Sequence, residues 1–306
     1  MPKFDVLVAG EINPDLILTG DVVPEFGQVE KLVDNATLAI GSSSAIFACG
    51  AARLGLKVAF IGVCGDDVFG RFMLDEMSKH QVDIENVIVS QGGSTGLSVI
   101  LNQVSDRAIL THPGLIAELQ ASDISDNLLR DSRHLHVASY FLQTKLQPDL
   151  PNLFRRARAL GLTTSLDTNY DPSEKWVGFD ELLSVTNVFL PNKKEALSLS
   201  GESNVDEAAS RLGSRVEALA IKLGAEGALG VHKGARVRVA SIPVKVSDTV
   251  GAGDSFDAGF IYGYLNQWSL EKSLRLACVC GALSTQQAGG TSGQPTLIEA
   301  VKFLDE

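Results

Sequence analysis

The segment from Asp248 to Phe260 contains the side chains and backbone best suited to chemistry in this chain. It reads Asp-Thr-Val-Gly-Ala-Gly-Asp-Ser-Phe-Asp-Ala-Gly-Phe. Gly251, Ala252 and Gly253 have small side chains or none, so another group can approach the backbone closely. An apolar pattern with helical spacing begins at Ala252. The N–H groups of the turn therefore point outward at the positive end of a predicted helix, an arrangement that binds anions such as phosphate.

Asp254 lies in the first turn of this predicted helix. A carboxylate beside a phosphate site repels the ligand, so its placement calls for a functional reason. One reason is general-base catalysis, in which the carboxylate accepts the proton of a hydroxyl as that hydroxyl attacks phosphorus. The alternative is an ordinary loop-to-helix junction, where an acidic side chain interacts favourably with the helix N-terminus.

The same segment resembles the C-terminal signature of the ribokinase-like (PfkB) carbohydrate kinase family, D-T-x-G-A-G-D, and every fixed position of the signature is present. The resemblance implies ATP-dependent phosphorylation of an alcohol. It assigns Asp254 as the catalytic base, and it assigns the backbone of Gly251, Ala252 and Gly253 to the transferring phosphoryl group. Thr249 of the same motif is assigned to the nucleotide. Weaker motifs of the family occur in the expected order along nearly the whole chain.

A second polar segment, Gly10 to Asp15, follows the first predicted strand, Phe4 to Ala9. Ligands of open α/β sheets bind beyond the carboxyl ends of the strands, so Asn13 and Asp15 are expected to project into the crevice. A carboxylate there can accept two sugar hydroxyls. Asn-Pro-Asp is also ordinary turn chemistry. The family carries an Asp at this point that holds the acceptor, which assigns Asp15, with Asn13, to the substrate.

Gly41 and Ser42 precede the first long predicted helix, Ala45 to Leu54. The family has two glycines here, followed by an Asn that contacts the sugar in ribokinase-type members. Gly41 matches, whereas Ser42 replaces the second glycine and Ile46 replaces the Asn. The replacement predicts an acceptor that is less hydroxylated than ribose or is held from elsewhere. Gly41 and Ser42 are assigned to the substrate site, although helix capping accounts for the serine somewhat better.

Asn192 and Glu195 lie between a predicted strand and a predicted helix, three residues apart and therefore on one face. Both offer oxygen atoms, which Mg²⁺ prefers, usually with several retained waters. The spacing equally fits a helix cap with the acid at the third position, and the two interpretations are compatible. The family has an N-x-x-E motif here that organises Mg²⁺ and phosphates through water, which assigns both residues to the cofactor and the metal.

Three more positions are assigned to the nucleotide by resemblance. Lys222 and Gly224 lie in a segment, Ile221 to Gly227, that is similar to the strand-end loop of the family near the phosphates. We expect Lys222 to reach a phosphate or, alternatively, solvent, and Gly224 to form a tight turn. Gly281 begins a stretch of small residues, ending at Gly290, that would form part of the adenine wall.

Two further features bear on the acceptor and the core. Asp171 stands where relatives often have an Arg, in a D-x-N-x-R motif after the strand at Thr163. An acidic group repels a phosphorylated acceptor, which favours a neutral substrate. His134 and His136 alternate along a predicted strand and share a face, so packing is the expected role of both.

The composition restricts the classes of protein to which this chain can belong. The 306 residues are enough for one large α/β domain, and 45% hydrophobic residues provide a core that needs no disulfides. The net charge of −11 disfavours general binding to nucleic acids or anionic membranes. Charged residues interrupt the N-terminal apolar run, and no run reaches about 18 residues, so we expect neither a signal peptide nor a membrane span. The cysteines form no C-x-x-C pair, which fits reduced thiols in the cytoplasm.

Apolar runs alternate with helical patterns along the chain, which predicts an α/β fold, a doubly wound and mostly parallel sheet flanked by helices. We expect one ribokinase-like kinase domain over residues 1–306. Strand-like pieces without helices are expected to form a small β-sheet lid, inserted at about residues 14–34 and 95–112. These pieces are Leu16–Leu18, Gln28–Val33, and a hairpin of Gly96–Leu101 and Ala108–Thr111 around residues 105–107. In the resembled family such strands cover the sugar, and in some members two lids pair in a homodimer.

These features predict an ATP-dependent kinase that transfers the γ-phosphate to a hydroxyl of a sugar. ATP and Mg²⁺ are the expected cofactors, and some relatives also bind K⁺, which the sequence leaves open. A nucleoside kinase of the same fold is the nearer alternative, because Ile46 and Phe47 would suit a base. A catalytically silent regulator is the more distant one, and the intact Asp254 argues against it. No Gly-Lys pair and no His-Arg-Asp occur, which excludes a Walker A loop and disfavours a protein kinase.

Overall fold

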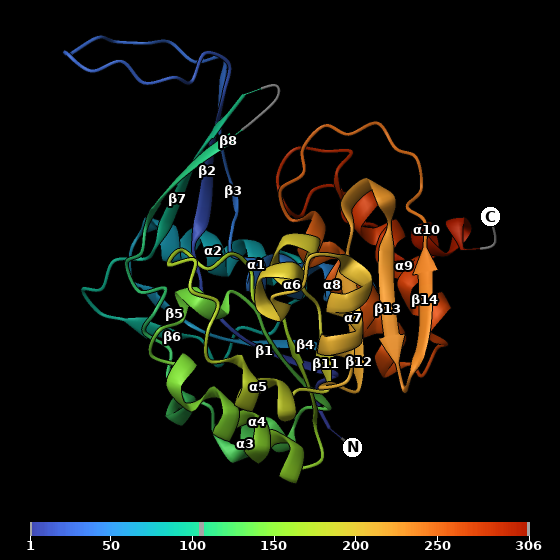
Figure 1. Ribbon diagram of the computed structural model, residues 1–306. Helices are drawn as coiled ribbons and strands as arrows, with labels where there is room; N and C mark the ends of the chain where they lie inside the picture. Colours follow the sequence, from blue (N-terminus) through green and yellow to red (C-terminus); the bar gives the residue numbers. More distant parts are fainter. Residues whose placement is uncertain (1, 104–106, 305–306) are drawn as a thin grey trace.

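The computed structural model describes residues 2–103 and 107–304. Within these residues, a sheet of eight strands forms the centre of the molecule, with helices on both faces (Figure 1). Its strands are, in spatial order, β14 (Ala235–Val239), β13 (Ala228–His232), β12 (Ala218–Lys222), β11 (Val188–Phe189), β10 (Thr163–Leu166), β9 (His134–Val137), β1 (Val6–Ala9) and β4 (Val58–Ile61). Neighbours from β12 to β4 are parallel, whereas β12, β13 and β14 are antiparallel. The predicted doubly wound, mostly parallel sheet is confirmed.

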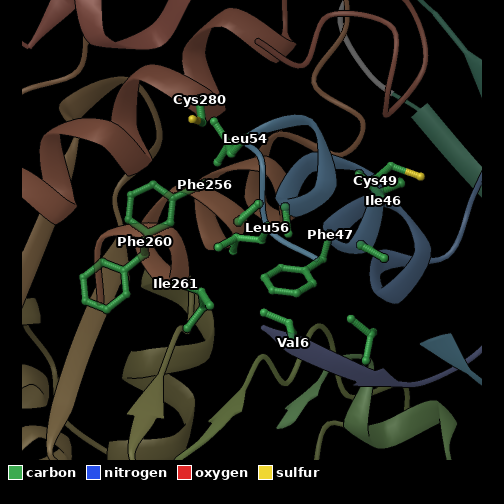
Figure 2. Packing of buried hydrophobic residues seen from close by; sticks show 14 of the residues in the cluster. Val6, Ile46, Phe47, Cys49, Leu54, Leu56, Phe256, Phe260, Ile261 and Cys280 are labelled. Atoms are coloured by element: carbon green, nitrogen blue, oxygen red, sulfur yellow. The ribbon is translucent and has the colours of Figure 1, made fainter. Parts of the chain in front are cut away.

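Two layers of helices cover the large sheet. The first layer contains α1 (Ser43–Arg53), α2 (Val68–Lys79), α8 (Ala252–Leu265), α9 (Leu270–Ser284) and α10 (Leu297–Ala300). The second contains α3 (Asp126–Arg130), α4 (Leu150–Ala159), α5 (Phe179–Ser184), α6 (Lys193–Ser200) and α7 (Val205–Gly213). Side chains of β1 alternate between the two cores, with Val6 and Val8 in the first and Leu7 and Ala9 in the second. Figure 2 shows Phe47 pointing from α1 toward Val6 in the first core.

A smaller sheet stands to one side of the large one (Figure 1). Within the described residues its strands are, in order, β3 (Asn35–Ile40), β2 (Pro14–Thr19), β7 (Leu97–Asn102) and β8 (Arg107–His112). The register places Asp15 of β2 beside Ser98 of β7, which in turn lies beside Thr111 of β8. Three neighbouring strands of the small sheet therefore carry polar side chains in one row, which Ala39 of β3 completes. A separate short pair, β5 (Val63–Gly65) and β6 (Ile88–Ser90), was not predicted from the sequence.

The predicted lid strand at Gln28–Val33 is wrong. Residues 26–33 form turns and irregular backbone that extends away from the molecule, and the chain returns to the sheet only at Asn35 (Figure 1). The physical reason is pairing: β3 matches β2 residue by residue from Pro14 opposite Ile40 to Thr19 opposite Asn35. The first lid segment thus continues to Ile40. The predicted hairpin has its strands in place, and residues 104–106 of its turn lie outside the described residues.

Among the described helices, none combines the length and the apolar composition that a membrane span requires. The cysteines at positions 49, 64, 278 and 280 are buried free thiols, as expected. Thr296 and Glu299 cap α10 reciprocally, since each side chain accepts a hydrogen bond from the backbone N–H of the other.

Candidate active site

Polar residues converge where the parallel strands of the large sheet end. Glu11 and Asn13 follow β1, Asp167 follows β10, and Lys222 is the last residue of β12. Parallel strands place their carboxyl ends at one edge of the sheet. The first turn of α8, with Asp254, meets the same edge, because the Lys222 and Asp257 side chains are in contact. Residues from distant parts of the sequence thus form one site.

The turn before α8 requires glycine for two reasons. Gly251 has a φ of 72°, a left-handed conformation that residues with a Cβ rarely adopt. A Cβ at this position would also lie 2.7 Å from the Cα of Gly290 and 2.9 Å from Cγ2 of Ile46. The first N–H groups of a helix have no partner within it, so this turn presents donors for an anion.

Ile46 packs directly against this turn and the loop that supports it. Its side chain is buried, and a Cβ on Gly290 would approach its Cδ1 to 2.4 Å. The apolar residue at the position of the family Asn therefore has a packing role behind Gly251. Gln294 adds a second connection, since its Nε2 donates to the carbonyl of Ile46 and to the hydroxyl of Ser255.

Asp254 is a buried acid, only 8% exposed, in the first turn of α8. It is therefore not an exposed acid at a helix end. Burial raises the pKa of Asp254 to about 8, and the neighbouring Asp167 carboxylate raises it as well. The Lys222 ammonium and a hydrogen bond with Ser43 oppose this shift. Such a carboxyl group can accept a proton near neutral pH, as a general base must.

Lys222 is held between two buried carboxylates and does not extend into solvent. Its Nζ lies 2.9 Å from Oδ2 of Asp167 and 3.1 Å from Oδ2 of Asp257. Carboxylate oxygens of Asp167, Asp254 and Asp257 lie within 4.8 Å of one another. Burial acts to lower the pKa of Lys222, but Asp167 and Asp257 raise it above its ordinary value, so the ammonium stays charged. We call these four residues the Lys222 cluster.

A cavity of about 570 Å³ opens beside the turn and the Lys222 cluster. Four positions assigned to the nucleotide line its wall: Lys222, Gly224, Thr249 and Gly281. Ala252 and Gly253 of the turn line it as well, whereas Asn192 and Glu195 do not. Ile242, Val244 and Phe256 add apolar surface, which suits a flat aromatic ring. Gly224 adopts a left-handed φ of 63° in a tight turn closed by the N–H of Gly227, as expected.

Another cavity, of about 630 Å³, lies at the opposite end of the large sheet, where β9, β10 and β12 begin. Arg133, Tyr264 and Trp268 line it. It contains none of the predicted site residues. The cavity of about 570 Å³ is therefore the one that lies beside the predicted site residues.

Asp15 and Gly41 lie together at the base of the small sheet. Asp15 is buried, and a Cβ on Gly41 would come within 2.2 Å of its Oδ1, so glycine is needed to make room for the carboxylate. Asn13 is buried nearby, with its Nδ2 3.4 Å from the hydroxyl of Ser98. Burial raises the pKa of Asp15 to about 7, and the opposing charge of Arg107 reduces this effect.

Glu11 is a buried residue of the site that was not singled out from the sequence. Its Oε2 accepts a hydrogen bond from Oγ of Ser44 at 2.6 Å, and its Oε1 accepts one from Oγ of Ser139 at 2.9 Å. Ser42 donates to the backbone carbonyl of Glu11 at 2.7 Å and caps α1 by accepting the N–H of Ala45. The Ser42 hydroxyl thus forms its hydrogen bonds within the protein. An acid directly after a buried strand is the signal that could have revealed Glu11.

Asn192 and Glu195 form the reciprocal cap of α6 that the spacing allowed. The Asn192 N–H donates to Glu195 Oε2 at 2.9 Å, and the Glu195 N–H donates to Asn192 Oδ1 at 3.0 Å. Glu195 is buried, and burial, with the charge of Asp167, raises its pKa to about 7. Asn192 is exposed, and its backbone bridges to Lys222 of the neighbouring strand. Two oxygen-bearing side chains beside the Lys222 cluster fit a hydrated Mg²⁺.

Asp171 is buried and holds its own loop, and its effect on a phosphorylated acceptor stays a prediction. Its carboxylate accepts hydrogen bonds from the N–H of Ser173 and the N–H of Trp176, both at 2.8 Å. Asp171 therefore fixes the loop that follows it. His134 and His136 are buried, hydrogen-bonded to Ser165, and have pKa values lowered by burial, in agreement with a packing role.

Comparison with known proteins gives consistent matches. The family model described as pfkB family carbohydrate kinase matches residues 3–297. An uncharacterized sugar kinase of Archaeoglobus fulgidus is 32% identical over 82% of this chain and 100% of its own length. The ribokinase of Haemophilus influenzae is 29% identical, with 97% of each chain covered. The crystal structure of adenosine kinase from Sinorhizobium meliloti has a TM-score of 0.87 at 26% identity, covering 98% of this chain and 99% of that one.

Because Lys222 compensates buried acids, we expect its substitution to lower the stability of the protein by an amount that depends on pH. Lys222→Met leaves buried carboxylates without their cation, which is expected to lower the free energy of unfolding by about 3–5 kcal/mol near pH 7. Uncompensated buried acids have raised pKa values, so the deficit should be smaller at pH 5 and larger at pH 8. Urea unfolding at both pH values measures this. Lys193→Met, which breaks only the exposed pair with Glu226, is the control and should cost less than about 1 kcal/mol. Equal losses in the two variants would contradict the prediction.

Proposed function

The chain belongs to the pfkB family of carbohydrate kinases, which phosphorylate sugars with ATP, and we propose that its catalytic machinery is the group of residues around the start of α8. The observation that carries this assignment is the place of Asp254. Its helix turn borders the 570 Å³ cavity through Ala252 and Gly253 on one side. On the other side Asp254 hydrogen-bonds to Ser43, whose neighbours Ser42 and Ser44 donate hydrogen bonds to Glu11. In this proposal the buried base stands between a nucleotide-sized cavity and the acceptor.

In this proposal ATP binds in the cavity, with its adenine against the apolar wall near Gly281 and its phosphates at the turn. Lys222 and Gly224 border the phosphates, and Thr249 lies at the edge of the same cavity. The sugar binds beneath the small sheet, where Asp15 accepts hydrogen bonds from its hydroxyls and Asn13 lies close by. Gly41 contributes by leaving space for the Asp15 carboxylate. Ser42 acts through the position of Glu11 and α1.

The proposed reaction is an in-line transfer. Asp254 accepts the proton of the attacking sugar hydroxyl, and the oxygen of that hydroxyl forms a bond to the γ-phosphorus. The bond between the γ-phosphorus and the oxygen that bridges to the β-phosphate breaks, and its electron pair stays on ADP. The N–H groups of the turn from Gly251 to Gly253 stabilise the charge on the phosphoryl oxygens during the transfer.

Mg²⁺ is the proposed metal cofactor, held through water near Asn192 and Glu195. When bound, it neutralises charge on the β- and γ-phosphates. K⁺ is a second candidate, because the Asp248 carboxylate joins the N–H of Val250 to the N–H of Gly289 and a cation beside it would stabilise this junction. Equal activity in KCl and NaCl at one ionic strength would reject a K⁺ requirement.

The acceptor is proposed to be a sugar, and a coupled assay of ADP release over a panel of sugars, with ATP and Mg²⁺, tests this. Nucleosides in the same panel test the alternative acceptor. The relatives matched by sequence are sugar kinases, and the similarity to adenosine kinase is one of structure at 26% identity, so the nucleoside is not favoured. Binding of ATP without turnover on any acceptor would instead support a regulator.

We also propose that the small sheet mediates a homodimer. Large apolar side chains are exposed on it and on its β2–β3 connection, including Phe26, Leu32, Ile109 and Leu110. Analytical ultracentrifugation at micromolar concentration tests the dimer, and a monomer under these conditions would reject it. A cytoplasmic location is proposed on the buried free thiols, and fractionation of cells that produce the protein checks it.

Asp254→Asn should abolish most turnover while leaving ATP binding intact. The amide keeps the shape of the side chain but cannot accept the proton, so kcat is expected to fall by about 10²- to 10⁴-fold. The Kd for ATP, measured by calorimetry, should change by less than about threefold, because the cavity wall is unchanged. Asp206→Asn, an exposed acid that pairs with Arg236 and Arg238, is the matched control. A kcat within tenfold of wild type would remove Asp254 from the proposed role.

The pH dependence follows from the raised pKa of Asp254. The base must be ionised to act, and its pKa is about 8 because of burial and the Asp167 carboxylate. Below that pH the active fraction falls by about tenfold per unit, so kcat/KM for the sugar should rise from pH 6 to about 8 and then level off. Initial rates at saturating ATP between pH 6 and 9.5 measure the profile. A profile that is flat between pH 6 and 8 would be inconsistent with a base of this pKa.

A further inference from the structure

Asp257 is a buried acid for which neither the signature motif nor the proposed reaction provides a role. It lies three residues after Asp254 on α8, hence on the same side of the helix, and is 1% exposed. Both of its carboxylate oxygens accept hydrogen bonds from Nζ of Lys222, at 3.2 and 3.1 Å. A buried carboxylate is costly, so this contact is the compensation that the structure provides for it.

Three separate elements determine where the Lys222 ammonium lies. Lys222 ends β12, Asp167 follows β10, and Asp257 is on α8. Hydrogen bonds to two carboxylates from different elements fix the Nζ, which otherwise sits on a flexible side chain with three rotatable donors. The ammonium is thus positioned by the large sheet and by α8 together.

The ammonium lies at the boundary between the cavity and the turn. Lys222 is part of the cavity wall, as is Gly253. A Cβ placed on Gly253 would lie 3.6 Å from the Lys222 Nζ, so the ammonium is close to the backbone that is proposed to bind the phosphoryl group. The Lys222 side chain keeps 12% of its surface exposed, whereas the side chains of Asp167 and Asp257 keep 3% and 1%. Of these three side chains, the cation is therefore the one that faces the cavity most.

A fixed cation at this place is suited to phosphoryl transfer. Negative charge is spread over the oxygens of the transferring group, and preoriented positive charge in a water-poor site stabilises it with little reorganisation. Its two carboxylate partners keep the lysine protonated despite burial. An ammonium without such partners would lose its proton or its position.

We propose that Asp257, together with Asp167, is a positioning residue that holds the Lys222 ammonium against the phosphoryl-binding turn, where the ammonium stabilises the transferring phosphoryl group. This inference rests on the proposed function and specifies how the charge of the transition state is met. A purely structural ion pair is the competing explanation. The two differ in what happens to kcat when Asp257 loses its charge but keeps its shape.

Asp257→Asn is the first test. We expect kcat to fall by about tenfold to a hundredfold, because an ammonium displaced by a fraction of an ångström loses its alignment with the phosphoryl group. The KM for the sugar should stay within about threefold, since Asp15 and Gly41 are untouched. Asp206→Asn, an exposed acid that also holds two cationic side chains, is the control and should retain wild-type kcat. A kcat of Asp257→Asn within twofold of wild type overturns the proposal.

A double-mutant cycle tests whether Asp257 acts through Lys222. In the Lys222→Met background, Asp257→Asn should change kcat by less than about twofold, because the group that it positions is gone. The double variant keeps the formal charge of the cluster, since one positive and one negative group are removed. Recovery of wild-type kcat in the double variant would mean that Lys222 only neutralises Asp257, and would overturn the proposal. The same fold-loss from Asp257→Asn in both backgrounds would do so too.

A binding measurement covers the case in which Lys222→Met does not fold. ADP with Mg²⁺ and aluminium fluoride mimics the transferring phosphoryl group, and ADP with Mg²⁺ alone does not. Asp257→Asn should weaken the affinity for the mimic by about the same factor as kcat and leave the affinity for ADP within about twofold. Equal changes in both affinities, or no change in either, overturn the proposal. Absence of sugar phosphorylation by the wild-type protein would instead reject the proposed function, so the two failures are distinguishable.

Discussion

The site depends on one electrostatic constraint: acidic side chains are buried next to the place where a triphosphate is proposed to bind. Asp167, Asp254 and Asp257 bring oxygens within 4.8 Å of one another, and an isolated buried carboxylate is unfavourable by several kcal/mol. The Lys222 ammonium makes this arrangement stable, because it pairs with two of the acids at 2.9 and 3.1 Å. Asp254 has no hydrogen bond to Lys222, and burial together with the Asp167 carboxylate raises its pKa to about 8. Two of the acids therefore hold the cation, and Asp254 is the one proposed to accept a proton.

The topology of the sheet brings a second source of positive potential to the same place. The positive N-termini of α1, α6 and α8 lie near the acidic residues at one edge of the sheet. Ser44 of α1 donates to Glu11, Asn192 before α6 bridges to Lys222, and Asp254 lies in the first turn of α8. Ser42 caps the first, Asn192 caps the second, and Gly251 opens the third without a side-chain cap. The uncapped helix is the one whose N–H groups are left for a ligand. The capping interpretation of Ser42 and Asn192 is thus confirmed, and their roles toward a ligand stay predictions.

Local patterns made much of this protein predictable, and long-range packing accounts for what they missed. The strand-helix alternation and the D-T-x-G-A-G-D signature depend on neighbours in the sequence, so both led directly to the α/β sheet and the turn before α8. The contact of Lys222 with Asp167 and Asp257 joins residues 55 and 35 positions apart, which no local spacing encodes. The mistaken strand at Gln28–Val33 has a similar cause, because pairing with β2, and not the local pattern, decides where β3 begins. The hydrogen bonds of Asp171 with the N–H groups of Ser173 and Trp176 were not predicted either, although they are local.

The small sheet and the turn before α8 are linked by packing. Ile17 of β2 and Ile100 of β7 form a buried apolar cluster with Val250, the residue directly before Gly251. The side chain at the variable position of the signature is therefore a contact for the small sheet. Because apolar contacts are most favourable when they exclude water, the position of the small sheet in this structure also supports the turn. Movement of the small sheet away from the body would expose Val250 and loosen the turn. If the small sheet covers the acceptor as proposed, exclusion of water and formation of the anion site become parts of one packing event, which would limit transfer of phosphate to water.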